Sequence, residues 1–349
     1  GDLSGTYPSP IVSQIQGIGI SNTAPISGQV LQYNGTNWFP ENPTIYTINS
    51  SNYLTSNPGD DKIINVQGTI NLSASFNNWN GSNNQHISGG TFDGGGTQMI
   101  DFGSNCIISN TVFNNIQING GSNVEFVNCK FNNISLLPNN CSILGGQILN
   151  STLNSSSQLG YVTNCNITSS TIPYIKRISN SLMSACTIGG NFLGLVSNNT
   201  INSCLINLTG NFTGNNCDET QVNITNATNT SSISENNFLI STLTGVIDVN
   251  LGSSSSPTGI NITGNTFVGN TNYPTTRYIR ITGSFGGTRG LVKINNNVAI
   301  GGSAVFVYPQ YTGTADLMVN DNDLMNTGGL GVTNNAIVGF VYARNNQIH

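Results

Sequence analysis

The sequence contains very little charge. Only 7% of its 349 residues are Asp, Glu, Lys or Arg, against about a quarter in an ordinary globular domain. The 9 basic and 14 acidic residues give a net charge of −5, so the chain lacks the basic surface that DNA or RNA binding requires. No apolar run approaches the length of about 18 residues that a membrane helix needs. Nucleic-acid binding and helical membrane insertion are therefore not expected.

Helical patterning is also missing. No segment combines apolar residues at i, i+3, i+4 and i+7 with the Glu, Lys, Ala and Leu that favour helices. The only histidines, His86 and His349, are too few for a catalytic triad or a metal cluster. The sequence therefore predicts an all-β chain with no cofactor.

The seven cysteines do not form a recognisable framework. Their number is odd and no Cys-x-x-Cys pair occurs, so disulfides and zinc are both unexpected. Because free cysteine packs as a small apolar residue, we expect a column of buried, reduced and inert thiols. Five of them follow a polar residue in a similar frame and are predicted to stack one per turn: Cys106, Cys129, Cys141, Cys165 and Cys204.

What the sequence does contain is a repeat. Residues 123–134 alternate apolar and polar side chains and end in an Asn pair. This ending returns at intervals of roughly 18 to 30 residues, which is the length of one turn of a parallel β-helix. Asn tolerates the left-handed backbone of a tight bend, and stacked amides can form hydrogen bonds from turn to turn. The copies of the ending lie at 113–116, 131–134, 235–238, 264–267, 295–298, 320–324 and 344–348.

The repeat predicts a right-handed parallel β-helix (solenoid), since crossovers between parallel strands are right-handed. Six apolar residues follow the Asn bends and are expected to be buried in one continuous stack: Phe113, Phe131, Phe238, Phe267, Val298 and Leu324. The β-helix is expected over residues 86–349, with residues 44–85 as its first turns and cap. After about residue 233 the turns lengthen, with surface insertions expected at 252–257, 270–276, 284–290 and 309–314.

Residues 1–43 differ from the rest and are expected to form an attachment and trimerisation segment. They are too short and too poor in apolar residues to fold alone. We therefore predict that three chains associate there, with Ile20, Val30, Tyr33 and Trp38 near the axis.

A resemblance covers this segment. The run Gly-Asp-Leu-Ser-Gly-Thr-Tyr-Pro-Ser-Pro, followed by Ala-Pro-Ile-Ser-Gly-Gln-Val-Leu-Gln-Tyr-Asn-Gly-Thr-Asn-Trp at 24–38, resembles a segment of bacteriophage tail fibres and tail-fibre-like proteins. The predicted β-helix resembles phage tailspikes in architecture only. The resemblance implies an extracellular, homotrimeric subunit of the virion that attaches to a glycan or protein of the host surface. Its N-terminal segment would join other tail or baseplate proteins.

No catalytic motif of that family matches this chain, so a structural and adhesive role is expected. A polysaccharide depolymerase and a bacterial surface adhesin are the alternatives. Glycan cleavage would need paired carboxylates, for which Asp93 with Asp101, or Asp218 with Glu219, are candidates, but carboxylates also serve in bends and caps. No catalytic residue is predicted. The run from Asp321 to Asp323 lacks the remaining frame of a calcium loop, so no metal site is predicted either.

The host contact is expected in the final quarter of the chain, where tyrosine and arginine gather. Tyrosine offers a flat face for stacking on sugars, and arginine a fork of donors for acidic groups. The same residues could instead pack between the chains of a trimer. The predicted receptor-binding residues are Tyr273, Arg277, Tyr278, Arg280, Tyr308 and Tyr311.

Overall fold

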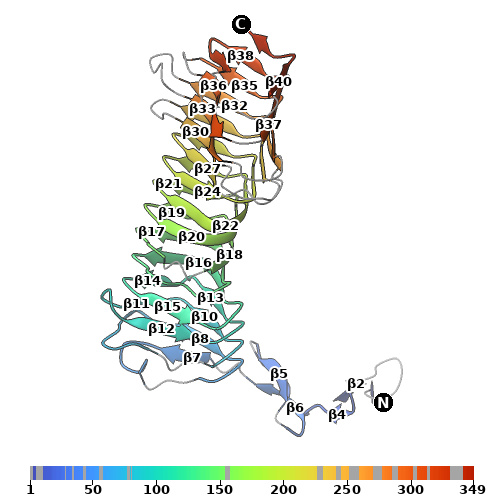
Figure 1. The fold of residues 1–349 in the computed structure, drawn as a ribbon. Helices are drawn as coiled ribbons and strands as arrows, with labels where there is room; N and C mark the ends of the chain where they lie inside the picture. The colour runs from blue at the N-terminus through green and yellow to red at the C-terminus, as the bar shows by residue number, and fades with distance from the viewer. Residues whose placement is uncertain are drawn as a thin grey trace.

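A computed structural model describes residues 3–4, 11–27, 29–33, 35–41, 45–54, 58–76, 79, 81–153, 158–225, 231–240, 245–250, 259–269, 277–284, 290–301, 305–312, 315–330 and 341–349. Throughout these residues the structure consists of strands, bends and turns, without any helix. Accordingly, no helix in this part of the chain is long and apolar enough to cross a membrane. From β7 onward, the strands stack in parallel register into one tall column (Figure 1). The prediction of an all-β parallel β-helix is confirmed, and its right hand remains a prediction.

Each turn of the column contributes strands to up to three faces, which we call A, B and C in chain order. Face A contains β7 (Ile45–Ile48), β8 (Ile63–Val66), β10 (His86–Ser88), β13 (Ile107–Ser109), β25 (Asn211–Thr213), β28 (Ser231–Ser234), β31 (Gly259–Thr263), β34 (Gly290–Asn295), β37 (Ala315–Asn320) and β40 (Val341–Arg344).

Face B contains β9 (Thr69–Asn71), β11 (Thr91–Asp93), β14 (Val112–Asn114), β19 (Asn166–Thr168), β21 (Leu182–Ser184), β23 (Thr200–Asn202), β26 (Asn216–Asp218), β29 (Asn237–Ile240), β32 (Thr266–Gly269), β35 (Val298–Ile300), β38 (Asp323–Met325) and β41 (Gln347–Ile348).

Face C contains β12 (Met99–Phe102), β15 (Gln117–Gly120), β24 (Leu205–Leu208), β27 (Gln221–Thr225), β30 (Gly245–Asn250), β33 (Arg277–Ser284), β36 (Val305–Thr312) and β39 (Gly328–Leu330). Five longer strands each continue across two faces. They are β16 (Glu125–Asn132) and β17 (Ser142–Leu149) over A and B, and β18 (Gln158–Thr163), β20 (Thr171–Ser179) and β22 (Thr187–Ser197) over C and A.

The bends between faces explain the abundance of asparagine. Bend 1 joins A to B, bend 2 joins B to C, and bend 3 joins C to A. At bend 1 Asn110, Asn128 and Asn164 all have φ between 52° and 56°. Asn adopts this left-handed backbone more readily than most residues, because its short side chain can form a local hydrogen bond. After Asn110 and Asn164 the next strand begins two residues later, whereas Asn128 lies within β16, which continues around the bend.

The predicted apolar stack is confirmed with one correction. Register-matched residues of face B form a single inward column along the whole solenoid, including the stacked rings of Phe92, Phe113 and Phe131. Val298 does not belong to it: Val298 is half-buried, and Ala299 occupies the inward position opposite Phe267. Val298 directly follows the Asn pair, but the inward position lies one residue later, at Ala299. The column reads Ile70, Phe92, Phe113, Phe131, Ile148, Ile167, Met183, Ile201, Cys217, Phe238, Phe267, Ala299 and Leu324. Ile348 continues the register on the last turn and is exposed.

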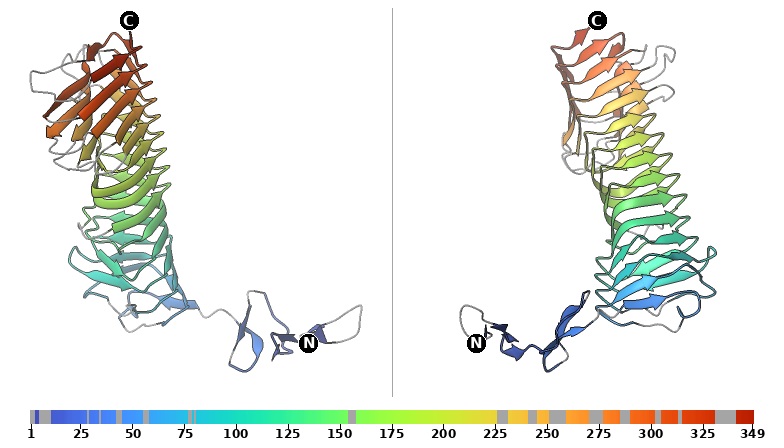
Figure 2. Two further views of the ribbon diagram at one scale, coloured as in Figure 1. Left: turned by 45° about the vertical axis from the view of Figure 1, so that its right-hand side comes forward. Right: turned by 180° about the vertical axis from the view of Figure 1, so that it is seen from behind.

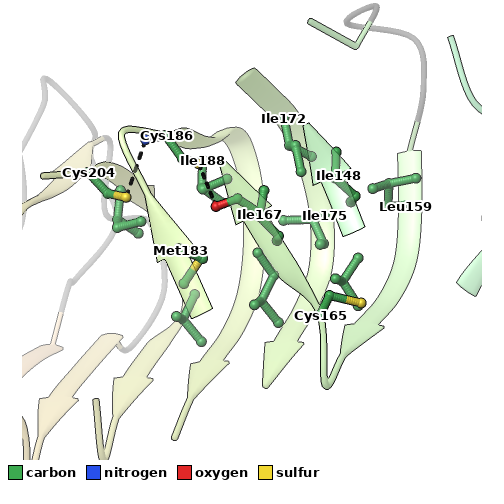
Figure 3. Close-up of a cluster of buried hydrophobic side chains, with 14 of the residues drawn as sticks. Ile148, Leu159, Cys165, Ile167, Ile172, Ile175, Met183, Cys186, Ile188 and Cys204 are labelled. Carbon is green, nitrogen blue, oxygen red and sulfur yellow. Dashed lines mark hydrogen bonds between the residues drawn. The ribbon is translucent and has the colours of Figure 1, made fainter. Parts of the chain in front are cut away.

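All seven cysteines are free and buried, as expected. They do not form one column, which corrects the prediction. Cys129 and Cys165 lie in bend 1, whereas Cys186 and Cys204 lie in bend 2 (Figure 3). Cys106 and Cys141 lie in bend 3, and Cys217 lies within β26. The three bends share one local geometry, a left-handed residue followed by a small buried one, and so they look alike in the sequence.

A ladder of buried asparagines runs along bend 1 in the upper half of the column. The side-chain amide of Asn265 donates to Oδ1 of Asn297 at 3.0 Å and to the backbone oxygen of Ile233 at 2.9 Å. Its own Oδ1 accepts from the amide of Asn236 at 2.9 Å. The same pattern joins Asn199, Asn215, Asn236, Asn265, Asn297, Asn322 and Asn346 in succession. Successive members are 16 residues apart at Asn199 and 32 residues apart at Asn265.

The N-terminal strands lie beyond the base of the column, to one side of it (Figure 2). They form three small antiparallel pairs: β1 (Leu3–Ser4) with β2 (Ile11–Val12), β3 (Gln14–Ile15) with β4 (Ile18–Gly19), and β5 (Val30–Tyr33) with β6 (Trp38–Glu41).

The predicted insertions have different outcomes. Residues 252–257 and 270–276 lie outside the described part of the chain, as does most of 284–290. Residues 309–312 are not an insertion, because they continue β36 in register with β33.

Candidate functional site

Three of the predicted receptor-binding residues lie on adjacent strands of face C. In β33 and β36, Arg280 is in register with Tyr308. The guanidinium carbon of Arg277 lies 4.0 Å from the centroid of the Tyr308 ring, a cation–π contact. Arg280 forms an ion pair with Asp248 of β30, which raises the pKa of Arg280. Both arginines are thus already engaged within the chain.

The other three do not strengthen this cluster. Tyr273 lies outside the described residues, and Tyr311 lies in β36 with its side chain outside the described part. Tyr278 is fully buried, and its hydroxyl donates to the backbone oxygen of Gly301 at 2.9 Å. Burial raises the pKa of Tyr278 to about 12. The prediction of a receptor contact is therefore wrong for Tyr278, which packs against Phe267 and Phe306 in the core.

A second cluster lies halfway along the column, on the outer side of face A. Glu125 of β16, Ser142 of β17, Tyr161 of β18 and Arg177 of β20 occupy the same register position on four successive turns. With about 4.8 Å between neighbouring strands, the row from Glu125 to Arg177 is about 14 Å long and runs parallel to the axis.

This row lines a surface cavity of about 390 Å³, which we call the mid-shaft groove. Tyr161 is 54% exposed, and Arg177 is exposed as well. Within the described part of the chain, no hydrogen bond or ion pair engages the side chains of Glu125, Tyr161 or Arg177. The groove is also lined by Leu144, Thr163, Ser179 and Asn180.

Side chains around the row form hydrogen bonds, whereas those of Glu125, Tyr161 and Arg177 do so with no described residue. The Ser179 hydroxyl donates to Oγ1 of Thr163 at 3.2 Å, within the wall of the groove. Next to Arg177, the Lys176 ammonium donates to Oδ1 of Asn140 at 2.6 Å. The groove therefore presents a flat aromatic face, one free guanidinium and one free carboxylate from rigid strands, which suits the binding of a polar, extended ligand.

Sequence reasoning missed this groove because the four residues belong to different turns. A signal was present: each stands three residues before the left-handed residue of bend 1. Those left-handed residues are Asn128, Gly145, Asn164 and Asn180. Aligning the turns on the bend would have placed Tyr161 next to Arg177. Along the sequence, tyrosine and arginine are instead concentrated in the C-terminal quarter.

The strand pairings of the described residues place no two carboxylates opposite each other. In every strand pairing of the described residues, each Asp or Glu stands opposite a residue that is not acidic. Asp93 accepts from the backbone N–H of Gly95 at 3.1 Å, and Asp218 accepts from the Asn202 amide at 3.1 Å. Asp323 lies 3.5 Å from His349. These carboxylates therefore have local structural partners.

A further cavity, of about 530 Å³, lies against bend 2 and is lined by Cys186, Cys204 and Glu219, among others. The backbone N–H of Cys186 donates to Sγ of Cys204 at 3.3 Å (Figure 3). The Cys204 thiol beside it lowers the pKa of Cys186, and the same contact raises the pKa of Cys204. Burial raises the pKa of Cys129 to about 11 and that of Cys141 to about 12.

Comparisons with known proteins give no family. No protein-family model matches the chain, and no curated protein sequence matches it. Among solved structures, the catalytic domain of Agl-KA aligns with 93% of this chain and 70% of its own, at 12% identity and a TM-score of 0.43. The periplasmic alginate epimerase AlgG aligns with 87% of this chain and 83% of its own, at 9% identity and a TM-score of 0.33.

A tailspike protein of E. coli bacteriophage HK620, in complex with a pentasaccharide, aligns with 86% of this chain and 70% of its own, at 12% identity and a TM-score of 0.30. At such scores the likeness does not bear on what this chain binds or catalyses. The β-helix assignment rests on the strand pairing described above.

Proposed function

We propose that the chain is a structural and adhesive subunit of a phage tail appendage that binds a host-surface glycan along the side of its β-helix. The observation that supports this most is the mid-shaft groove, in which Tyr161 and Arg177 lie in register on rigid strands with their side chains unengaged. Exposed tyrosine next to arginine is a combination typical of binding surfaces. The resemblance of the N-terminal segment to phage tail fibres supports a location in a virion, with the N-terminal strands toward other tail proteins.

The predicted C-terminal cluster is a weaker candidate for the host contact. Arg277 and Arg280 would first have to leave Tyr308 and Asp248 before they could bind a ligand. Depolymerisation is also less favoured, because a hydrolytic pair of carboxylates needs two acids facing one groove. Glu125 is the one acid among the described residues that line the mid-shaft groove.

The test is binding of the full chain to an array of purified bacterial surface polysaccharides. The variant Tyr161→Ala should bind the recognised polysaccharide about tenfold more weakly, because a stacking contact of about 1.4 kcal/mol is lost. A matched control is Tyr342→Ala, which removes a tyrosine that is also exposed on face A, in β40 at the end of the column. Equal loss in the two variants, or no loss in Tyr161→Ala, contradicts the proposal. Release of reducing sugar during the assay would instead favour the depolymerase.

A further inference from the structure

The charges of the mid-shaft groove are separated along its length. Arg177 is the one cation and Glu125 the one anion among the described residues that line it. They stand three turns apart, which is about 14 Å at the usual spacing of parallel strands. Between them lie the hydroxyl of Ser142 and the exposed face of Tyr161. The groove therefore has a cationic end, an aromatic middle and an anionic end.

Each end favours a different chemical group. A free guanidinium binds carboxylate or phosphate oxygens through two parallel N–H donors. A free carboxylate accepts hydrogen bonds from sugar hydroxyls but repels a second anion. The net charge of −5 adds to the repulsion of a polyanion. A ligand that is acidic at every sugar would be attracted at one end of the groove and repelled at the other.

We propose that the mid-shaft groove selects a sparsely acidic glycan, with one acidic group per repeat unit bound at Arg177. An uncharged sugar stacks on Tyr161, and hydroxyls of the next sugar donate to Glu125, so the chain of sugars runs parallel to the axis. This inference rests on the proposed function and names its ligand class. The acidic group is a carboxylate or a phosphate ester, since both fit the guanidinium.

The experiment uses the full chain and four classes of bacterial polysaccharide on one array. They are neutral polymers, polymers with one uronic acid per repeat, polymers with one phosphate per repeat, and polyuronates with an acid on every sugar. The wild-type protein should bind a member of the second or third class most tightly, which also identifies the acidic group. Binding should weaken as ionic strength rises, because the contact with Arg177 is partly exposed.

Substitutions at Arg177 and at Glu125 test the two ends separately. Arg177→Gln should weaken binding to the sparsely acidic polymer at least tenfold, and Arg177→Lys should lose less, because it keeps the charge without the fork. Glu125→Gln should strengthen binding to polyuronates at least threefold by removing a repelling anion. The matched control Arg344→Gln changes the net charge equally at an exposed site in β40 and should stay within twofold of wild type.

The inference is overturned if the tightest ligand is neutral or a polyuronate, or if Arg177→Gln binds like wild type. These outcomes leave the proposed function standing as long as Tyr161→Ala still weakens binding. Failure of the proposed function is distinguishable, because the wild-type protein would then bind no polysaccharide of any class, or Tyr161→Ala would bind all of them unchanged.

Discussion

Asparagine serves two purposes at adjacent positions of bend 1. Asn198, with φ of 57°, supplies the left-handed backbone of the bend. Asn199, which follows it, is buried, and its amide donates to Oδ1 of Asn215 on the next turn at 2.9 Å. Below Asn199, Cys165 and Ser181 occupy the same buried position without forming an amide ladder. The second position accepts any small residue whose polar groups can be satisfied by the neighbouring turn.

The ladder predicts a large effect of one substitution. Asn265→Ala removes the acceptor of two bonds from Asn236 and the donor to Ile233 and Asn297. Because buried polar groups left unpaired cost about 1–3 kcal/mol each, the free energy of unfolding should fall by at least about 2 kcal/mol in urea titration. Asn261→Ala, on the outer side of β31, is the control and should change it by less than about 0.5 kcal/mol. Equal stability of the two variants would contradict the structural role of the ladder.

The cysteine environments predict one reactive thiol. The contact with Cys204 lowers the pKa of Cys186, which lies at the cavity of bend 2, whereas burial raises the pKa of Cys129, Cys141 and Cys165 to about 11 or 12. Since the thiolate is the reactive form, labelling of Cys186 should be faster than that of the other thiols and should accelerate as pH rises. Mass spectrometry of the native protein after brief alkylation should find Cys186 labelled first. The variant Cys186→Ser should lose this fast phase, and an unchanged fast phase would refute the assignment.

At the scale of strands, one apolar column of face B holds successive turns together. Phe131 lies in that column with its ring stacked on Phe113 at 5.5 Å and packed edge-on against Phe126 at 5.1 Å. Neighbouring turns contact each other mainly through such columns, as expected of a solenoid.

Phe131→Ala should therefore lower the free energy of unfolding by about 3–5 kcal/mol, the usual cost of a large cavity in a packed core. Lys130→Ala, which changes the exposed preceding residue of β16, is the control. Chemical denaturation of both variants measures the difference. If Phe131→Ala unfolds at the denaturant concentration of wild type, the register of this column is incorrect.

The arrangement of the strands could be predicted from the sequence only in part. Period-2 alternation and the Asn bends were sufficient to predict the parallel β-helix and five of the six stacked residues. They misplaced Val298 by one position, and they merged cysteines of three bends into one column, because the bends have the same local sequence. They could not reveal the mid-shaft groove, since Tyr161 and Arg177 become neighbours only once the number of residues in each turn is known.

At the scale of the whole molecule, the N-terminal strands leave several large apolar side chains exposed. Val30 and Tyr33 are 48% and 43% exposed, and Leu3, Ile11, Val12, Ile26 and Leu31 are also exposed. Trp38 is half-buried, with its ring 5.4 Å from that of Tyr33, and forms a bridge with Ile20. Three of the four residues predicted to lie at a trimer axis are therefore close together within one chain.

We predict that three chains associate through this segment. Light scattering at micromolar concentration should give three times 36.8 kDa. A variant carrying Val30→Asp and Tyr33→Asp should give the monomer mass, because it places charge on the apolar surface. If this variant remains a trimer, the interface lies in the β-helix instead. If the wild-type protein is a monomer, the prediction is wrong.

The asparagine ladder also determines how the column would respond to a pulling force. Each boundary between turns above Asn199 is crossed by two additional axial bonds, one from a backbone N–H and one from a side-chain amide. Tension along the axis loads the boundaries in series, so the boundary with the fewest axial bonds yields first. The turns below Asn199 are joined by axial side-chain bonds at other bends, such as those from Asn105 to Asn84 and from Asn123 to Asn105. Resistance to axial tension is therefore carried by bend 1 in the upper turns and by amide bonds at the other bends in the lower turns.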